Sequence, residues 1–376
     1  MINLQLLEVI ALSAPIVCAL TCMVMMLLDA EAHRKSPQER RLRLFLALTY
    51  FVTSLGWLGM VFYAESPRLF ASYYTVFLLT LMLDQVMIYR FVSIITNTGE
   101  QREFNRLHLI VPVFITLISL YCDINVPIEQ QIAVIYGYDE TNTGMGFKVM
   151  YIFTAVVFVV YNTLYPILNL LHIHRYRRFI ANYSADAYRT SLGWLSVIQV
   201  LILISVPIPL AALLLGVHGS ASGFVVWFGA LPYFINYLIL CYNLLDNNYL
   251  IIQPDTPQGD GMSGSAATPI DRKHFERYLR DRKPYLDSRL RVTDLAAGLN
   301  TNRSYLSAFI NQEYGTNFCR FINRCRLAEL DRLRLSTANA DKTNMDLLLM
   351  AGFSSYRCYI RAKNEEDKQK VLKVFG

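Results

Sequence analysis

A group of polar side chains near residue 305 has the types and spacing that can read DNA bases. The segment 292–314 has the periodicity of two helices around a turn at 300–302, and its second helix directs Leu306, Phe309 and Ile310 inward. The turn and the opposite helix face carry Asn302, Arg303, Ser304, Ser307, Asn311 and Gln312. In a major groove Arg reads guanine, Asn or Gln reads adenine, and Ser adapts to either. The pattern therefore predicts a helix-turn-helix unit that reads DNA.

The residues that follow make this prediction more specific, because they form an ordered set over about residues 270–370. The set comprises Asp294-Leu295-Ala296, Tyr305-Leu306-Ser307, Gly315, Phe318, Phe321-Ile322-Asn323, Arg326-Leu327, Ala351-Gly352-Phe353-Ser354-Ser355, Tyr359 and Arg361. In these residues the chain resembles the C-terminal DNA-binding domain of AraC-family transcriptional regulators. The resemblance implies two helix-turn-helix units joined by a long helix. It also implies DNA contacts from Ser355, Tyr356, Arg357 and Arg361 in the second unit.

The second unit departs from the family pattern in three places. Leu348 stands where the family usually has Ala, and Lys363-Asn364 replaces an aromatic-Lys pair. The usual Gly-x-Thr-Pro ending is replaced by a segment that contains three acids, at positions 365–367. Since acids repel phosphates, we expect only a short DNA-facing segment in the second recognition helix.

The composition divides the chain into an apolar part and a basic part. Of all residues, 54% are hydrophobic and 17% are charged, against about 45–50% and about 25% in average soluble domains. Residues 269–376 hold 21 of the 35 basic and 13 of the 29 acidic residues, a net charge of +8, which leaves −2 on residues 1–268. This division excludes a single soluble enzyme domain, a disordered chain and a disulfide-stapled secreted scaffold. It indicates a membrane protein with a domain that binds a polyanion.

The apolar part contains stretches long enough to cross a bilayer as helices. Seven spans are predicted, at 5–28, 43–63, 73–95, 107–121, 147–171, 191–215 and 223–245. Loops on one side of these spans, counted together with Arg43 at the start of the second span, hold eleven Lys and Arg, and those on the other hold one or two. Because cytoplasmic loops carry the excess of basic residues, this bias places the N-terminus outside and the C-terminal domain in the cytoplasm.

The fold class expected is therefore all-α, a polytopic seven-helix transmembrane bundle joined to a cytoplasmic AraC-type domain. The bundle is predicted over 1–250 and the DNA-binding domain over 269–376. Between them, residues 251–268 are rich in Gly, Pro, Ser and Thr, which is typical of a flexible linker.

Polar residues inside the predicted spans are the candidates for signal reception, because ionisable groups in a bilayer are costly and usually functional. The candidates are Asp84, Arg90, Asn162, Gln199 and Asn236. The alternative for the amide side chains is a role in packing, through hydrogen bonds between helices.

Enzyme chemistry has no support in the sequence, which lacks a phosphate-binding Gly-rich loop, a His-Glu-x-x-His pair and a Cys-x-x-Cys pair. We expect no catalytic residue, cofactor or metal. The expected partners are double-stranded DNA and the lipid bilayer, with a homodimer, a small or lipophilic ligand, or a membrane partner protein left open. The expected protein is thus a DNA-binding transcription regulator in the bacterial inner membrane. The alternative is a receptor or transporter-like membrane protein whose basic domain docks on protein or lipid.

Overall fold

The computed structural model describes residues 4–98, 104–137, 145–186, 191–205, 222–250 and 270–375. These ranges are helical and contain no β-strand, with one isolated bridge between Ser184 and Arg291. The expected all-α class is confirmed for this part of the chain. The chain divides into a first unit, Met1–Ile173 with Gly193–Ile251, and a second unit, His174–Leu192 with Ile252–Gly376. The predicted linker, 251–268, lies outside the described residues.

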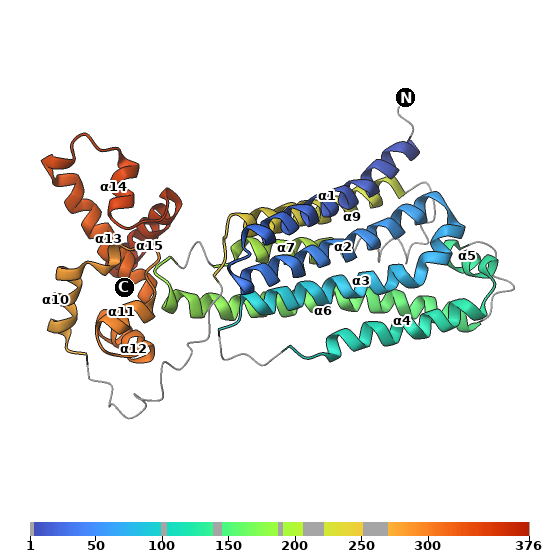
Figure 1. Ribbon diagram of the computed structural model, residues 1–376, viewed down its shortest axis with the longest axis horizontal. Helices are drawn as coiled ribbons and strands as arrows, with labels where there is room; N and C mark the ends of the chain where they lie inside the picture. Colours follow the sequence, from blue (N-terminus) through green and yellow to red (C-terminus); the bar gives the residue numbers. More distant parts are fainter. Residues whose placement is uncertain are drawn as a thin grey trace. The chain divides into compact units, whose positions relative to one another are not determined.

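The first unit consists of long apolar helices. They are α1 (Leu4–Ala32), α2 (Pro37–Glu65), α3 (Pro67–Ile95), α4 (Leu107–Asn125), α5 (Ile128–Tyr136), α6 (Met145–Tyr183), α7 (Gly193–Ser205) and α9 (Ser222–Leu245), shown in Figure 1. From His174 onward α6 belongs to the second unit. By length and composition, five described helices can cross a membrane: α1 from Val9, α2, α3, α4 and α6. They contain or largely overlap the first five predicted spans.

The other two predicted spans are described only in part. The span 191–215 is represented by α7, which is apolar but has 13 residues, and positions 206–215 lie outside the described residues. The span 223–245 coincides with α9, whose stretch Gly229–Leu245 is a shorter apolar helix. The count of seven thus stays a prediction, while five candidate spans are present.

Two prolines and one serine define the ends of α2 and α3. Pro37 and Pro67 each occupy the first position of a helix, where a missing N–H costs nothing. Ser66 ends α2 by donating its N–H to the Phe62 carbonyl, and its hydroxyl accepts from the Leu69 N–H to begin α3. One residue therefore turns the chain between two helices.

The helices of the first unit pack side by side. α2 contacts α1 and α3, α9 contacts α1 and α7, and α4 and α5 contact α3 (Figure 1). Large apolar side chains stay exposed on the outer faces, among them Leu28, Phe114 and Ile152. Such surfaces suit contact with lipid chains better than contact with water.

The second unit contains two helix pairs, each a short helix followed by a longer one. A long middle helix lies between the two pairs in the chain. Its helices are α10 (Arg272–Arg282), α11 (Val292–Gly298), α12 (Arg303–Tyr314), α13 (Phe318–Leu335), α14 (Asn344–Met350) and α15 (Tyr356–Phe375). Side chains cap the helices as the sequence dictates: Asn302 accepts from the Tyr305 N–H, and Asn317 from the Arg320 N–H. The turn between α14 and α15 needs Gly352, whose φ is +90° and whose added Cβ would lie 2.5 Å from the Tyr285 carbonyl oxygen.

Each short-long pair has its own apolar core. Leu306 and Ile310 of α12 are fully buried, as the period of the sequence predicts. Phe275 packs its ring against Phe309 and Phe321 at centroid distances of 5.1 and 5.6 Å. In the second pair, Leu348 is fully buried in a cluster with Phe353 and Tyr359, so the larger side chain at this position fills the core.

Arg326, in the middle of α13, holds the second unit together. It is 2% exposed, and its guanidinium donates to the carbonyls of Tyr285 at 2.8 Å, Asp287 at 2.8 Å and Ala185 at 3.2 Å. These acceptors lie in two separate segments, one before α11 and one after α6. A buried guanidinium therefore satisfies the backbone of two separate loops.

Arg326→Ala is expected to destabilise the second unit by at least about 3 kcal/mol, because it removes three hydrogen bonds from a charged donor, each worth about 1.5–3 kcal/mol. Hydrogen exchange of the full chain in lipid nanodiscs would show lower amide protection in α13–α15. The matched control is Arg324→Ala on the same helix, which removes a half-exposed pair with Glu366 worth less than about 1 kcal/mol. Equal protection in the two variants would contradict the role of Arg326.

Candidate nucleic-acid interface and polar sites of the bundle

The first candidate recognition helix, α12, presents part of the predicted polar set to solvent. Ser304, Asn311 and Gln312 are exposed, and Ser307 is half-buried. The side chain of Asn302 is exposed but serves as the N-cap of α12. Arg303, the first residue of α12, is half-buried by other side chains of its unit.

The second candidate recognition helix, α15, begins with a similar arrangement. The Ser355 hydroxyl accepts from the Cys358 N–H, which caps the helix. Tyr356, Arg357 and Arg361 are exposed on the first turns. The structure therefore leaves an aromatic and two basic side chains accessible beside a helix N-terminus, a place where backbone N–H groups favour anions.

The acids that follow are turned toward α13. Glu365 pairs with Arg320 at 3.2 Å, and Glu366 pairs with Arg324 at 2.7 Å. Their charge is therefore compensated inside the unit, and the length of the DNA-facing segment stays a prediction. The third acid, Asp367, is exposed.

Glu329 shows how a similar ion pair joins α10 to α13. It is 7% exposed and accepts from Arg332 at 2.5 Å and from Lys283 at 3.0 Å. The hydrogen bond from Arg332, assisted by Lys283, lowers the pKa of Glu329 to about 2. This carboxylate is thus ionised at neutral pH. It forms ion pairs with two of the basic side chains that contribute to the net positive charge of this part of the chain.

Within the bundle, Asp84 and Arg90 of α3 do not meet. Asp84 accepts a hydrogen bond from Thr53 of α2. The guanidinium of Arg90 lies over the rings of Phe45 and Phe104, at 5.5 and 5.2 Å. Among the described ion pairs none joins Asp84 to Arg90, so the carboxylate has a hydroxyl as its partner and the cation has aromatic faces.

The amide side chains connect helices. Asn162 of α6 accepts from Gln85 of α3 at 3.1 Å and from Tyr233 of α9 at 3.3 Å, and Gln199 of α7 accepts from Asn169 at 2.9 Å. These bonds agree with the packing alternative for Asn162 and Gln199. Asn236 is 4% exposed, and neither its oxygen nor its nitrogen has a hydrogen-bond partner among the described residues.

An apolar groove of about 650 Å³ lies between α1 and α9. Its walls include Ser13, Cys18, Cys22, Phe234 and Cys241. Two of the thiols bond to backbone oxygens of α9, Cys18 to Phe234 and Cys22 to Tyr237. A groove of this volume and lining can hold a lipophilic molecule.

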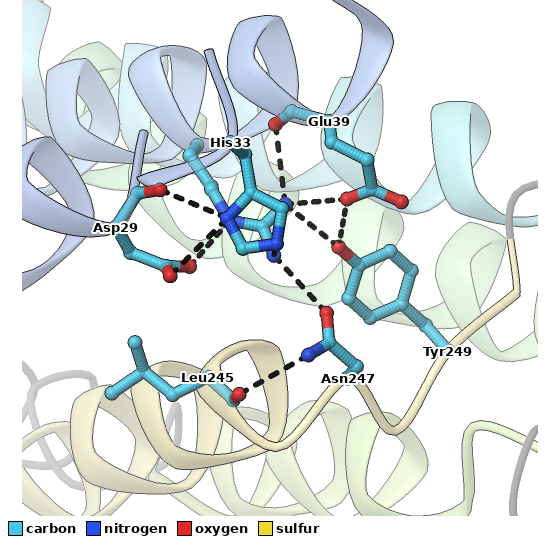
Figure 2. Close-up of polar contacts among 7 residues, drawn as sticks. Asp29, His33, Glu39, Leu245, Asn247 and Tyr249 are labelled. Carbon is cyan, nitrogen blue, oxygen red and sulfur yellow. Dashed lines mark hydrogen bonds and ion pairs between the residues drawn. The ribbon is translucent and has the colours of Figure 1, made fainter. Parts of the chain in front are cut away.

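A buried arginine at the start of the second predicted span joins three segments of the first unit. Arg43 of α2 is fully buried and forms ion pairs with Asp29 of α1 and Glu39 of α2. It also donates to Tyr249 at 3.0 Å and Asn247 at 3.1 Å, both after α9. Figure 2 shows Asp29, His33, Glu39, Asn247 and Tyr249 gathered around this guanidinium.

The surroundings of Arg43 form a closed network. Burial raises the pKa of the Tyr249 phenol, and its hydroxyl donates to Glu39. His33 contacts the Arg43 guanidinium through Nε2 at 3.3 Å, and its Nδ1 lies 3.3 Å from Asp29. Arg43 thus ties the ends of α1 and α2 to the segment that leads out of the bundle.

No protein-family model, curated protein or solved structure matches this chain. The family resemblance therefore rests on the residues quoted above.

The sequence signal for the Arg43 network was the presence of acids in an otherwise basic loop. Glu39 stands four residues before Arg43, a spacing that brings two side chains to the same face of a helix. Asp29 lies on the other side of the turn, and Tyr249 is about 200 residues away, so only the folded chain reveals them as partners.

Arg43→Gln is expected to lower the stability of the bundle by about 2–4 kcal/mol, because it leaves two partly buried carboxylates without their cation. Thermal unfolding of the full chain in nanodiscs, followed by tryptophan fluorescence, measures the effect. Adding Glu39→Gln should recover part of the loss, since only one carboxylate then lacks its partner.

The matched control is Arg41→Gln, which removes the same charge from an exposed position two residues away. A similar loss in both variants would show that net charge, and not the buried network, sets the stability.

Proposed function

We propose that the chain is a membrane-embedded transcription regulator that binds specific DNA through an AraC-like domain under control of a transmembrane bundle. The observation that carries the proposal is the pair of capped helices, α12 and α15, with exposed Ser304, Asn311, Gln312, Tyr356 and Arg357. Both lie in the chain's basic part, beside the long helix α13. Exposed polar side chains on such helices are suited to the major groove.

The membrane part of the proposal rests on the five apolar helices, with α7 and α9 as parts of the two remaining spans. The loop charges favour a cytoplasmic C-terminal domain in a bacterial inner membrane. A lipophilic ligand in the groove between α1 and α9, or a membrane partner, would stabilise one of two bundle arrangements by binding it more tightly. The Arg43 network is suited to transmit the change, since it includes the segment that leaves α9.

A second candidate function is a receptor or transporter-like protein whose basic domain docks on lipid or protein. It is favoured by the exposed basic side chains of α10, namely Arg277, Arg280 and Arg282. A basic helix face of this kind can also lie against anionic lipid.

DNA binding is tested with the full chain in nanodiscs of neutral lipid and a pool of random duplexes. Selection should enrich one sequence, and its affinity should exceed that of a scrambled duplex and fall steeply as salt rises, because bound phosphates release counterions. Equal affinity for both duplexes would contradict the regulator, and binding to anionic vesicles alone would favour the second candidate.

Arg357→Ala is expected to cost about 1–3 kcal/mol on the selected duplex and to relax the preference at one base pair, as loss of a guanine-reading side chain does. Fluorescence anisotropy with the selected duplex and its single-base variants measures both effects. Arg289→Ala is the control, because Arg289 is exposed and outside α12 and α15. An equal loss on every duplex would instead identify Arg357 as a phosphate contact.

A further inference from the structure

The segment that follows the fifth predicted span, 147–171, belongs to the second unit from His174 onward. α6 runs without interruption from Met145 to Tyr183, and the division between the units falls inside it, after Ile173. Residues 174–186 therefore lie in one unit with α10–α15. Their contacts with these helices are made by the last turn of α6 and by the three residues that follow it.

The last turn of α6 covers the first residue of α12. The rings of Phe179 and Tyr183 stack at a centroid distance of 5.4 Å and an interplanar angle of 23°. The Arg303 guanidinium carbon lies 4.7 Å from the Phe179 centroid and 6.0 Å from that of Tyr183. A guanidinium in this position is attracted by the negative faces of the rings. Arg303, the base-reading candidate at the start of α12, thus already has a partner within the chain.

The residues after α6 are held by their backbone. Ser184 and Ala185 are 5% and 1% exposed, and the Ala185 N–H donates to the Leu290 carbonyl at 3.0 Å. The Ala185 carbonyl accepts from Arg326 at 3.2 Å. These bonds fix the segment on the surface between α11 and α13, and they do so without depending on its side chains.

Asp186 reaches the start of α15. Its carboxylate accepts from the Ser354 hydroxyl at 2.6 Å and from the Cys358 thiol at 3.2 Å. Burial raises the pKa of the Cys358 thiol, so this group keeps the proton that it donates. Helix N-termini attract carboxylates and phosphates for the same reason, the partial positive charge of their free N–H groups. Asp186 therefore presents an anion beside α15, where DNA would present a phosphate.

We propose that residues 179–186 are an internal inhibitor that competes with DNA for both recognition helices. The aromatic pair holds Arg303 at the start of α12, and the Asp186 carboxylate occupies the start of α15. The inference rests on the proposed function, because it takes DNA as the competitor. It adds the regulation of that surface: the chain binds DNA well only after this segment has moved away from it.

A disulfide between position 186 and Cys358 would hold residues 179–186 in place. In Asp186→Cys the new thiol faces the native Cys358, and oxidation should join them, with the linked peptide identified by mass spectrometry. The full chain in nanodiscs is then titrated into a pool of mixed-sequence 30-base-pair duplexes. The oxidised form should bind about 10-fold or more weakly than the reduced form, because less protein is in the competent state.

The matched control combines Asp186→Cys with Cys358→Ser, which cannot form this link and should bind DNA equally well under both conditions. If the cross-linked protein binds DNA as tightly as its reduced form, the inhibitor role is overturned.

Phe179→Ala removes the ring that holds the Arg303 guanidinium. It should raise DNA affinity by about 3- to 30-fold, the range expected when one cation–π contact is removed. It should also raise the labelling of Arg303 by phenylglyoxal, a readout that needs no DNA. His174→Ala, at an exposed position of the same helix, should change neither value. Unchanged labelling in Phe179→Ala would overturn the contact itself.

The two proposals fail in different ways. One outcome is that labelling of Arg303 responds to the disulfide and to Phe179→Ala while no form binds duplex DNA. In that case the proposed function fails, and the competition with DNA fails with it. If all forms bind DNA with the same affinity, DNA binding stands and the inhibitor role is overturned.

Discussion

The second unit depends on one buried guanidinium. Arg326 donates to carbonyls in three places, and two of these, Tyr285 and Asp287, lie in the connection before α11, while the third, Ala185, lies after α6. Hydrogen bonds from a charged donor such as this guanidinium are worth about 1.5–3 kcal/mol each. The same side chain therefore positions the helix pair that begins with α11 and keeps the Ser184–Asp186 segment in place.

In the first unit, polar side chains lie buried among apolar helices and also need hydrogen-bond partners. A bilayer core offers no water to polar groups, so side chains on different helices must satisfy one another. Gln85 and Asn162 do so, as do Asn169 and Gln199. At the end of the bundle, Arg43 has two carboxylates, a phenol and an amide as partners. Bundle arrangements that differ in function would have to exchange some of these partners, which makes them the places where a signal can act.

The sequence predicted those features that depend on neighbours along the chain. Apolar length revealed α1, α2, α3, α4 and α6, and the helical period revealed the buried side of α12. The positions of the polar residues on α12 followed from the period, but the use of Asn302 as a cap and the burial of Arg303 did not.

The features that the sequence did not reveal depend on partners far apart in the chain. Arg43 and Tyr249 are separated by about 200 residues, and Asp186 and Ser354 by 168. Periodicity carries no information about such pairs, because any exposed loop can hold an Asp or an Arg. The count of loop charges included Arg43 but could not show its environment, and this arginine is fully buried.

The position of residues 179–186 in the chain has a consequence for biosynthesis. They are translated about 90 residues before α10 begins, and domains generally fold as they leave the ribosome, N-terminal parts first. The surface that Arg303 and Ser354 contribute to would therefore form in the presence of the segment that occupies it. If residues 179–186 act as the proposed inhibitor, a newly made molecule would begin in the inhibited state, and DNA binding would require a later change.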